Sequence, residues 1–280
     1  MVDDGNGIAV NQPHIMLAGG VRMPQLGLGL WQTPAEETAG IVRAAIAAGY
    51  RAVDTAMIYG NEAGVGEALA EHPDIFVTTK LWNDDQGYDR TLRAFDASAK
   101  RLQRDIIDLY LIHWPVPGKG LYVESWKALV RLKQEGRVRA IGVSNFNQKH
   151  LGRIVAETGE TPVLNQVELH PHFQQKAARA FHAEQGIWTE SWSPLGQGKL
   201  LADATLAKIA ARYGKTPAQA IIRWHLDSGL IVIPKSVRTP RMAENIDVFD
   251  FCLDAQDIDA IAALDMVDGR IGPDPATAFH

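Results

Sequence analysis

The sequence contains a single cysteine, Cys252, among its 280 residues. One thiol cannot form an internal disulfide bond, and without neighbouring ligands it does not make a metal site. No apolar run approaches the roughly 18 residues of a membrane span. Positive charge is not in excess, since 28 Lys and Arg residues stand against 33 Asp and Glu residues. We therefore expect no metal, no membrane and no nucleic acid among the ligands and partners.

The beginning of the chain lacks the basic and apolar segments of a secretion signal. Residues 1–7 instead carry two acids, Asp3 and Asp4, and no long apolar stretch follows. We expect residues 1–12 to be mobile. Together with the near absence of cysteine, this pattern favours a cytoplasmic location.

Short runs rich in aliphatic residues alternate with longer segments whose apolar residues have helical spacing. This alternation is typical of a parallel sheet covered by helices. The runs that we expect to form parallel strands are residues 26–28, 52–54, 75–80, 107–113, 140–144, 163–168, 187–192 and 230–234. Eight strand–helix units predict the α/β class and a (β/α)8 barrel, or TIM barrel, forming one domain over residues 1–280.

Other segments lie outside this repeat. Gly19 and Gly20 separate two short apolar runs and predict an N-terminal β-hairpin. Residues 206–213 and 255–264 predict two extra helices, and we expect residues 266–280 to form a loop over the barrel mouth. An open doubly wound sheet is the alternative, but such sheets bind dinucleotides through Gly-x-Gly-x-x-Gly after the first strand. Gly27-Leu28-Gly29 does not continue with that spacing, which favours the closed barrel.

Chemically active side chains follow three successive strands. Asp54 ends the second expected strand and Tyr59 lies in the loop after it, while Lys80 and His113 end the third and fourth. The carboxyl ends of barrel strands open on one face, where active sites form. Each residue alone has an ordinary structural explanation, such as a helix cap or a surface charge. Their placement on successive strands favours a shared site.

Four segments of the chain resemble signature sequences of the aldo-keto reductase family. Residues 49–62 read Gly-Tyr-Arg-Ala-Val-Asp-Thr-Ala-Met-Ile-Tyr-Gly-Asn-Glu, and residues 108–115 read Asp-Leu-Tyr-Leu-Ile-His-Trp-Pro. Residues 141–146 and 233–237 carry two more, the last followed by Arg241, Glu244 and Asn245. The similarity extends from about residue 15 to about residue 268 and is greatest to the bacterial 2,5-diketo-D-gluconate reductase branch.

The resemblance implies a catalytic tetrad of Asp54, Tyr59, Lys80 and His113, and the chemistry of carbonyl reduction supports it. Hydride addition to a carbonyl carbon builds negative charge on oxygen, which must receive a proton. Tyrosine is a weak acid with a pKa of about 10, and a neighbouring ammonium such as that of Lys80 would lower this value. Asp54 would balance Lys80, and His113 would donate a hydrogen bond to the carbonyl oxygen.

The resemblance also implies NADPH as the cofactor. It assigns the nicotinamide carboxamide to Ser144, Asn145 and Gln166, and the stacking position to Trp192, where the family more often has Tyr or Phe. Lys235, Ser236 and Arg241 would hold the adenosine 2′-phosphate. The residues expected to bind the cofactor are Leu30, Trp31, Asp54, Ser144, Asn145, Gln166, Trp192, Ser193, Leu195, Gly196, Lys235, Ser236, Val237, Arg241, Glu244 and Asn245.

A mostly apolar pocket is expected to bind the substrate, because aromatic residues follow several strands. The residues expected to line it are Trp31, Met57, Tyr59, Trp82, His113 and Trp114. The short loop after Trp114 and the short C-terminal tail indicate an open pocket for small carbonyl compounds. Keto sugar acids, methylglyoxal and simple aldehydes all fit this description.

Two other functions stay open from the sequence. The chain could be an accessory subunit that binds NADPH and regulates a partner, although no extra interaction segment is present. It could also be a barrel isomerase or aldolase in which Lys80 forms a Schiff base, which fits the cofactor signatures less well. The family resemblance implies a monomer.

Overall fold

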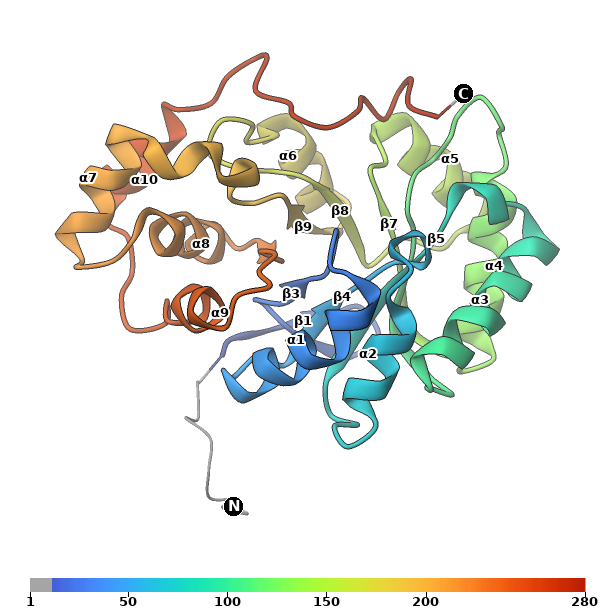
Figure 1. Cartoon of the computed structure of the whole chain (residues 1–280). Helices are drawn as coiled ribbons and strands as arrows, with labels where there is room; N and C mark the ends of the chain where they lie inside the picture. The colour runs from blue at the N-terminus through green and yellow to red at the C-terminus, as the bar shows by residue number, and fades with distance from the viewer. Residues whose placement is uncertain (1–11, 280) are drawn as a thin grey trace.

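The computed structural model describes residues 12–279, and its central feature there is an eight-stranded parallel sheet (Figure 1). The strands are β3 (Leu28–Gly29), β4 (Ala52–Asp54), β5 (Phe76–Leu81), β6 (Ile107–Ile112), β7 (Val138–Ser144), β8 (Leu164–Glu168), β9 (Trp188–Trp192) and β10 (Ile231–Val232). All neighbouring pairs are parallel and follow the chain order. Each strand overlaps one of the segments expected from the sequence, and the predicted fold class is confirmed.

Contacts between the first and last strands close the sheet into a barrel. Leu26 forms an isolated parallel bridge to Val232, and Gly29 forms another to Lys235. A Cβ atom at Gly29 would lie 2.7 Å from the carbonyl oxygen of Ile233. Only glycine permits this close approach of two backbones, so the residue type at position 29 is needed for closure.

The helices lie on the outside of the barrel, between the strands. They are α1 (Ala35–Ala47), α2 (Glu62–Leu69), α3 (Tyr88–Leu102), α4 (Tyr122–Gln134), α5 (Gln148–Thr158), α6 (Lys176–Glu184), α8 (Pro217–Asp227) and α9 (Thr239–Ile246). Two further helices, α7 (Ala204–Arg212) and α10 (Ala255–Ala262), occupy the segments predicted to hold the extra helices. Within residues 12–279, no helix is both long enough and apolar enough to cross a bilayer.

An antiparallel hairpin precedes the barrel and covers one of its ends. It consists of β1 (His14–Leu17) and β2 (Val21–Pro24), as the two glycines predicted. Leu17 and Met23 are buried in one apolar cluster with Ala52 and Phe76, the first residues of β4 and β5. The hairpin therefore seals the amino end of the barrel, and the carboxyl end is left for a site.

The two ends of the described chain both contact the barrel. Residues 1–11 of the expected mobile segment lie outside the described residues, whereas Gln12 is buried and donates a hydrogen bond to the carbonyl oxygen of Leu26. Figure 1 shows the C-terminal segment, in red, running from α10 across the fold toward α5. It passes the carboxyl end of the barrel, because the backbone N–H groups of Ile271 and Gly272 donate to the Glu168 carboxylate, the last residue of β8.

The sequence analysis did not single out α2, and its packing explains why. This helix has only eight residues, and two of them are the poor helix formers Gly64 and Gly66. A Cβ atom at Gly66 would lie 2.5 Å from the carbonyl oxygen of Arg101, at the end of α3. Glycine therefore weakens the local helical signal but allows α2 to pack closely against α3.

Replacing Gly66 tests this packing. Gly66→Ala is expected to lower the free energy of unfolding by about 1–3 kcal/mol, because the new methyl group overlaps the backbone of α3. The control is Gly40→Ala in the middle of α1, where an added Cβ atom meets nothing within 4 Å. That change is expected to stabilise the protein by about 0.5–1 kcal/mol through helix propensity. Urea unfolding measures both, and equal effects of the two substitutions would refute the packing account.

Candidate active site

A buried ion pair lies at the carboxyl end of the barrel. Lys80, in β5, and Asp54, the last residue of β4, are 0% and 3% exposed. The Lys80 ammonium donates hydrogen bonds to Asp54 Oδ1 at 2.5 Å and to the Thr55 carbonyl oxygen at 2.9 Å. Burial by itself would lower the pKa of Lys80, but Asp54 and Tyr59 outweigh burial and raise it. Lys80 is therefore an ammonium ion at neutral pH.

Tyr59 and His113 face this ion pair. Tyr59 ends the short 3-10 helix η1 (Met57–Tyr59), and the centroid of its ring lies 5.3 Å from Lys80 Nζ. The His113 ring packs edge-on against that of Tyr59, with a centroid distance of 5.8 Å. On its other side Trp82 packs against His113 at 5.2 Å. The four residues of the expected tetrad thus lie together at one mouth.

The proton affinities of Tyr59 and His113 follow from burial and from Lys80. Burial raises the pKa of Tyr59; the Lys80 ammonium opposes this, but the net shift is upward. Lys80 thus lowers the pKa of Tyr59 as expected, but the loss of hydration on burial disfavours the phenolate more strongly. Burial, followed by the charge of Lys80, places the pKa of His113 well below its ordinary value. His113 is a neutral imidazole, which can still donate one N–H.

A second buried carboxylate, Glu190 in β9, lies beside the tetrad. The side-chain amide of Gln166, in β8, connects the two acids: its Nε2 atom donates to Asp54 Oδ2 at 2.8 Å and to Glu190 Oε2 at 2.9 Å. Sequence reasoning missed Glu190. The available signal was a charged residue in the middle of a strand that is buried on both faces, where such residues are rare.

The tetrad opens into a cavity of about 620 Å³ at the carboxyl end of the barrel. The residues of the expected site that line it are Trp31, Asp54, Tyr59, Trp82, His113, Trp114, Asn145, Gln166, Trp192, Ser193 and Lys235. The lining residues that sequence reasoning did not select are Gly29, Gln32, Ile58, Pro194, Gln197, Ile233, Ile271, Gly272, Pro273 and Phe279. The expected residues that do not line it are Leu30, Met57, Lys80, Ser144, Leu195, Gly196, Ser236, Val237, Arg241, Glu244 and Asn245.

Met57 requires a correction. Its side chain lines a separate recess with Arg90, Arg93 and Arg101, whereas its neighbour Ile58 lines the central cavity. The reason is the tight turn of η1, because successive residues of a 3-10 helix point about 120° apart. A position between Asp54 and Tyr59 in sequence does not therefore guarantee a place in the pocket.

Asn145 is held in place by three hydrogen bonds. Its amide nitrogen donates to the His113 carbonyl oxygen and to Ser144 Oγ, both at 3.0 Å, and its Oδ1 accepts from the Trp192 indole at 2.9 Å. Asn145 and Ser193 have φ angles of 62° and 49°, in the left-handed region that few residues other than glycine adopt. Strained backbone of this kind gathers at functional sites.

Positive charge lies near the other end of the cavity. Lys235 lines the cavity and is exposed, while Arg241 is exposed on the neighbouring helix α9. Within residues 12–279 neither residue forms an ion pair with an acid. Glu244 and Asn245 lie on the same helix, where Glu244 accepts a hydrogen bond from Thr216 at 2.7 Å and Asn245 is buried.

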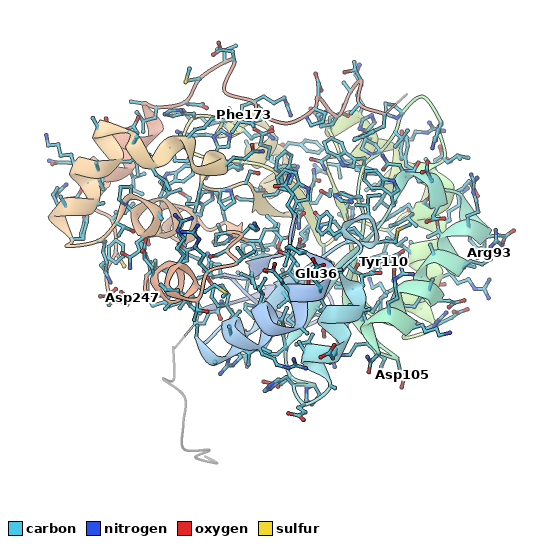
Figure 2. The ribbon with its side chains drawn as sticks, in the orientation of Figure 1. Glu36, Arg93, Asp105, Tyr110, Phe173 and Asp247 are labelled. Atoms are coloured by element: carbon cyan, nitrogen blue, oxygen red, sulfur yellow. The ribbon has the colours of Figure 1, made fainter. Side chains whose placement is uncertain are left out.

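Aromatic residues form the opposite wall. Phe279 packs edge-on against Trp82 and Trp114, with centroid distances of 5.7 and 5.2 Å. Trp31 is 43% exposed at the same mouth. The C-terminal segment that carries Phe279 is also fixed near Phe173, labelled in Figure 2 beneath it, because the Arg270 guanidinium lies 4.6 Å from the Phe173 ring centroid. The tail thus contributes an apolar face to the cavity.

A parallel barrel with buried acid–base residues at the carboxyl end of its strands defines the class of barrel enzymes with an active site at that face. In the part of the chain that the structure describes, no group of three or more His, Cys, Asp or Glu residues is placed to hold a metal ion. Residues 23–266 match the model of the aldo/keto reductase family. The chain belongs to this family, an oxidoreductase family, and the resemblance found in the sequence is confirmed.

Several known proteins are similar to this chain along most of its length. An aldo-keto reductase of Mycolicibacterium smegmatis is 56% identical and the methylglyoxal reductase DkgA of Escherichia coli K12 is 52% identical, each alignment covering 95% of this chain and 98% of the relative. A crystal structure of a Gox0644 mutant in complex with NADPH is 59% identical, with a TM-score of 0.95, covering 96% of this chain and 99% of that chain. A Bombyx mori aldo-keto reductase in complex with NADP is 36% identical, with a TM-score of 0.85, covering 92% and 94%.

Proposed function

We propose that this protein reduces small aldehydes and ketones to alcohols with NADPH, and that Tyr59 is the general acid. The observation that carries the proposal is the contact of Tyr59 with the buried Lys80–Asp54 pair and with neutral His113 at one cavity. When bound, NADPH supplies the hydride. A cytoplasmic location and a monomeric state stay predictions from the sequence.

Each polar residue has a separate task in this proposal. The Tyr59 hydroxyl gives its proton to the carbonyl oxygen as negative charge develops there. The Lys80 ammonium stabilises the resulting phenolate, and the low-dielectric surroundings of a buried site strengthen that interaction. His113 donates its N–H to the same carbonyl oxygen and orients the substrate. Asp54 holds Lys80 in place and, together with Tyr59, outweighs the cost of burying the ammonium.

The cavity offers groups that suit the parts of a dinucleotide. Asn145, Gln166 and Trp192 supply two amides and a flat aromatic ring for the nicotinamide, with Ser144 beside them. Lys235 and Arg241, which lack acidic partners within residues 12–279, supply charge for the 2′-phosphate together with the Ser236 hydroxyl. Leu30, Leu195, Gly196, Val237, Glu244 and Asn245 are proposed as further cofactor contacts beyond the residues that line the cavity.

The walls of the cavity favour small carbonyl substrates. Trp31, Trp82, Trp114 and Phe279 surround the approach to Tyr59 with apolar surface. A pocket of this kind accepts a short carbon chain and leaves orientation to the few polar groups at its end. Methylglyoxal, keto sugar acids and simple aldehydes are the proposed classes, and the name of the Escherichia coli relative supports the first of them.

The Schiff-base alternative is disfavoured by the charge of Lys80. A lysine that attacks a carbonyl carbon must be neutral, and such lysines have lowered pKa values. The pKa of Lys80 is instead raised, and its ammonium is held by Asp54 and by the Thr55 carbonyl oxygen. A role as an accessory subunit predicts NADPH binding without turnover, which the experiments below distinguish.

Tyr59→Phe tests the acid. The substitution is expected to lower kcat for methylglyoxal reduction by about 10²- to 10⁴-fold, because it removes the proton donor and little else. The dissociation constant of NADPH, measured by fluorescence titration, should stay the same. The control is Tyr110→Phe on β6: Tyr110, seen inside the fold in Figure 2, is buried and its hydroxyl has no hydrogen-bond partner within the described residues. Near wild-type turnover in Tyr59→Phe would remove Tyr59 from the acid role.

Arg241→Ala tests the cofactor preference. It is expected to raise the KM for NADPH at least about tenfold and to leave the KM for NADH nearly unchanged, because only NADPH carries the 2′-phosphate. Steady-state assays with both cofactors measure this selectivity. Arg22→Ala, an exposed arginine in β2 of the hairpin at the opposite end of the barrel, is the control. Equal catalytic efficiency of the wild type with NADPH and NADH would contradict the assignment.

A further inference from the structure

Glu190 is an acidic residue that is fully buried inside the barrel. It is 0% exposed and lies in the middle of β9, paired in register with Gln166 of β8 and Ile231 of β10. Its Oε2 atom accepts from Gln166 Nε2 at 2.9 Å, whereas Oε1 has no hydrogen-bond partner within residues 12–279. Among the described residues no cationic side chain forms an ion pair with this carboxyl group, in contrast to Asp54, which holds Lys80.

The Gln166 amide connects Glu190 to the tetrad. An amide nitrogen carries two hydrogens, and Nε2 of Gln166 donates one to each acid, at 2.8 Å to Asp54 and 2.9 Å to Glu190. A continuous set of contacts thus runs from Glu190 through Gln166 and Asp54 to Lys80, and on to the ring of Tyr59. With both hydrogens of Nε2 committed to the acids, Gln166 can meet a cofactor only through its Oε1 atom.

The charge balance of this set depends on Glu190. The titratable groups that face it are Asp54 on β4, Lys80 on β5 and Tyr59 on η1, while β8 contributes an amide and β10 an aliphatic residue. One ammonium cannot balance two buried carboxylates, and an unbalanced buried charge is strongly unfavourable. Burial, and then the charge of Asp54, raises the pKa of Glu190 to about 8.

We propose that Glu190 is a positioning residue of carbonyl reduction, which acts through Gln166 on the Asp54–Lys80 pair and thereby on the acidity of Tyr59. This inference rests on the proposed function. When Glu190 is protonated, Asp54 alone balances the positive charge of Lys80. The neutral Glu190 side chain still accepts the hydrogen bond that fixes the Gln166 amide. When Glu190 loses its proton, its negative charge raises the proton affinity of Tyr59, which becomes a poorer acid. Reduction therefore slows as Glu190 ionises.

Glu190→Gln, which has the shape of the neutral acid, tests this role in the enzyme. At pH 6.5 its kcat is expected to stay within about threefold of the wild type, since both side chains are then uncharged. The wild-type kcat for methylglyoxal should fall as the pH rises through about 8, and the variant should not show this fall. Coincident pH profiles of the two proteins would overturn the proposal.

Thermal unfolding gives a readout that does not involve catalysis. The pKa of Glu190 is raised in the folded state, so its contribution to stability is present at low pH and is lost as the pH rises toward about 8. The melting temperature of the wild type should therefore fall by several degrees relative to Glu190→Gln between pH 5 and 8.5. The surface control Glu157→Gln should show no such trend. A constant difference between the wild type and Glu190→Gln would overturn the raised proton affinity.

A second variant separates a positioning role from a purely structural one. Glu190→Met keeps the volume but removes the acceptor of Gln166, so kcat should fall about tenfold, and Gln at the same position should restore it. Equal kcat for the Met and Gln variants would overturn the role.

If the wild type does not oxidise NADPH with any carbonyl compound, the proposed function fails while the unfolding experiment still tests Glu190. If the wild type is an active reductase and the pH profiles coincide, only this inference fails.

Discussion

The ion pair between Lys80 and Asp54 is the interaction on which the rest of the site depends. It joins two neighbouring strands at the carboxyl end of the barrel and places a permanent positive charge among buried groups. That charge opposes the effect of burial on Tyr59 and adds to the effect of burial on His113, whereas at Glu190 burial and the negative charge of Asp54 outweigh it. The proton affinities of the whole cluster therefore follow from burial together with the opposite charges of Lys80 and Asp54.

The closed barrel provides the buried surroundings of this ion pair. The hairpin seals the amino end with apolar side chains, and Gly29 lets the first and last strands meet. The site lies at the open end, where the tail adds Phe279 and is tied down by the Glu168 carboxylate. A cavity with apolar walls and a few polar groups at its base follows from this arrangement.

The sequence predicted the strands and the tetrad because both leave local signals: aliphatic runs, and polar residues directly after them. Long-range features left weaker ones. The two glycines of α2 weakened the helical pattern of that segment, although Gly66 is needed for its packing on α3. Because of the turn of η1, Ile58 lines the cavity in place of the expected Met57. No sequence pattern shows how strongly burial raises the pKa of Tyr59. Phe279 reaches Trp82 across nearly 200 residues of chain, which no local pattern encodes.

The central claim is that Lys80 promotes reduction through Tyr59, and a double-mutant cycle on kcat tests it most directly. Residues that act as one unit lose activity in a non-additive way. We expect Tyr59→Phe and Lys80→Met each to lower kcat strongly, and the double variant to be no slower than Tyr59→Phe alone. Losses that multiply in the double variant would show that Lys80 acts independently of Tyr59 and would contradict the account.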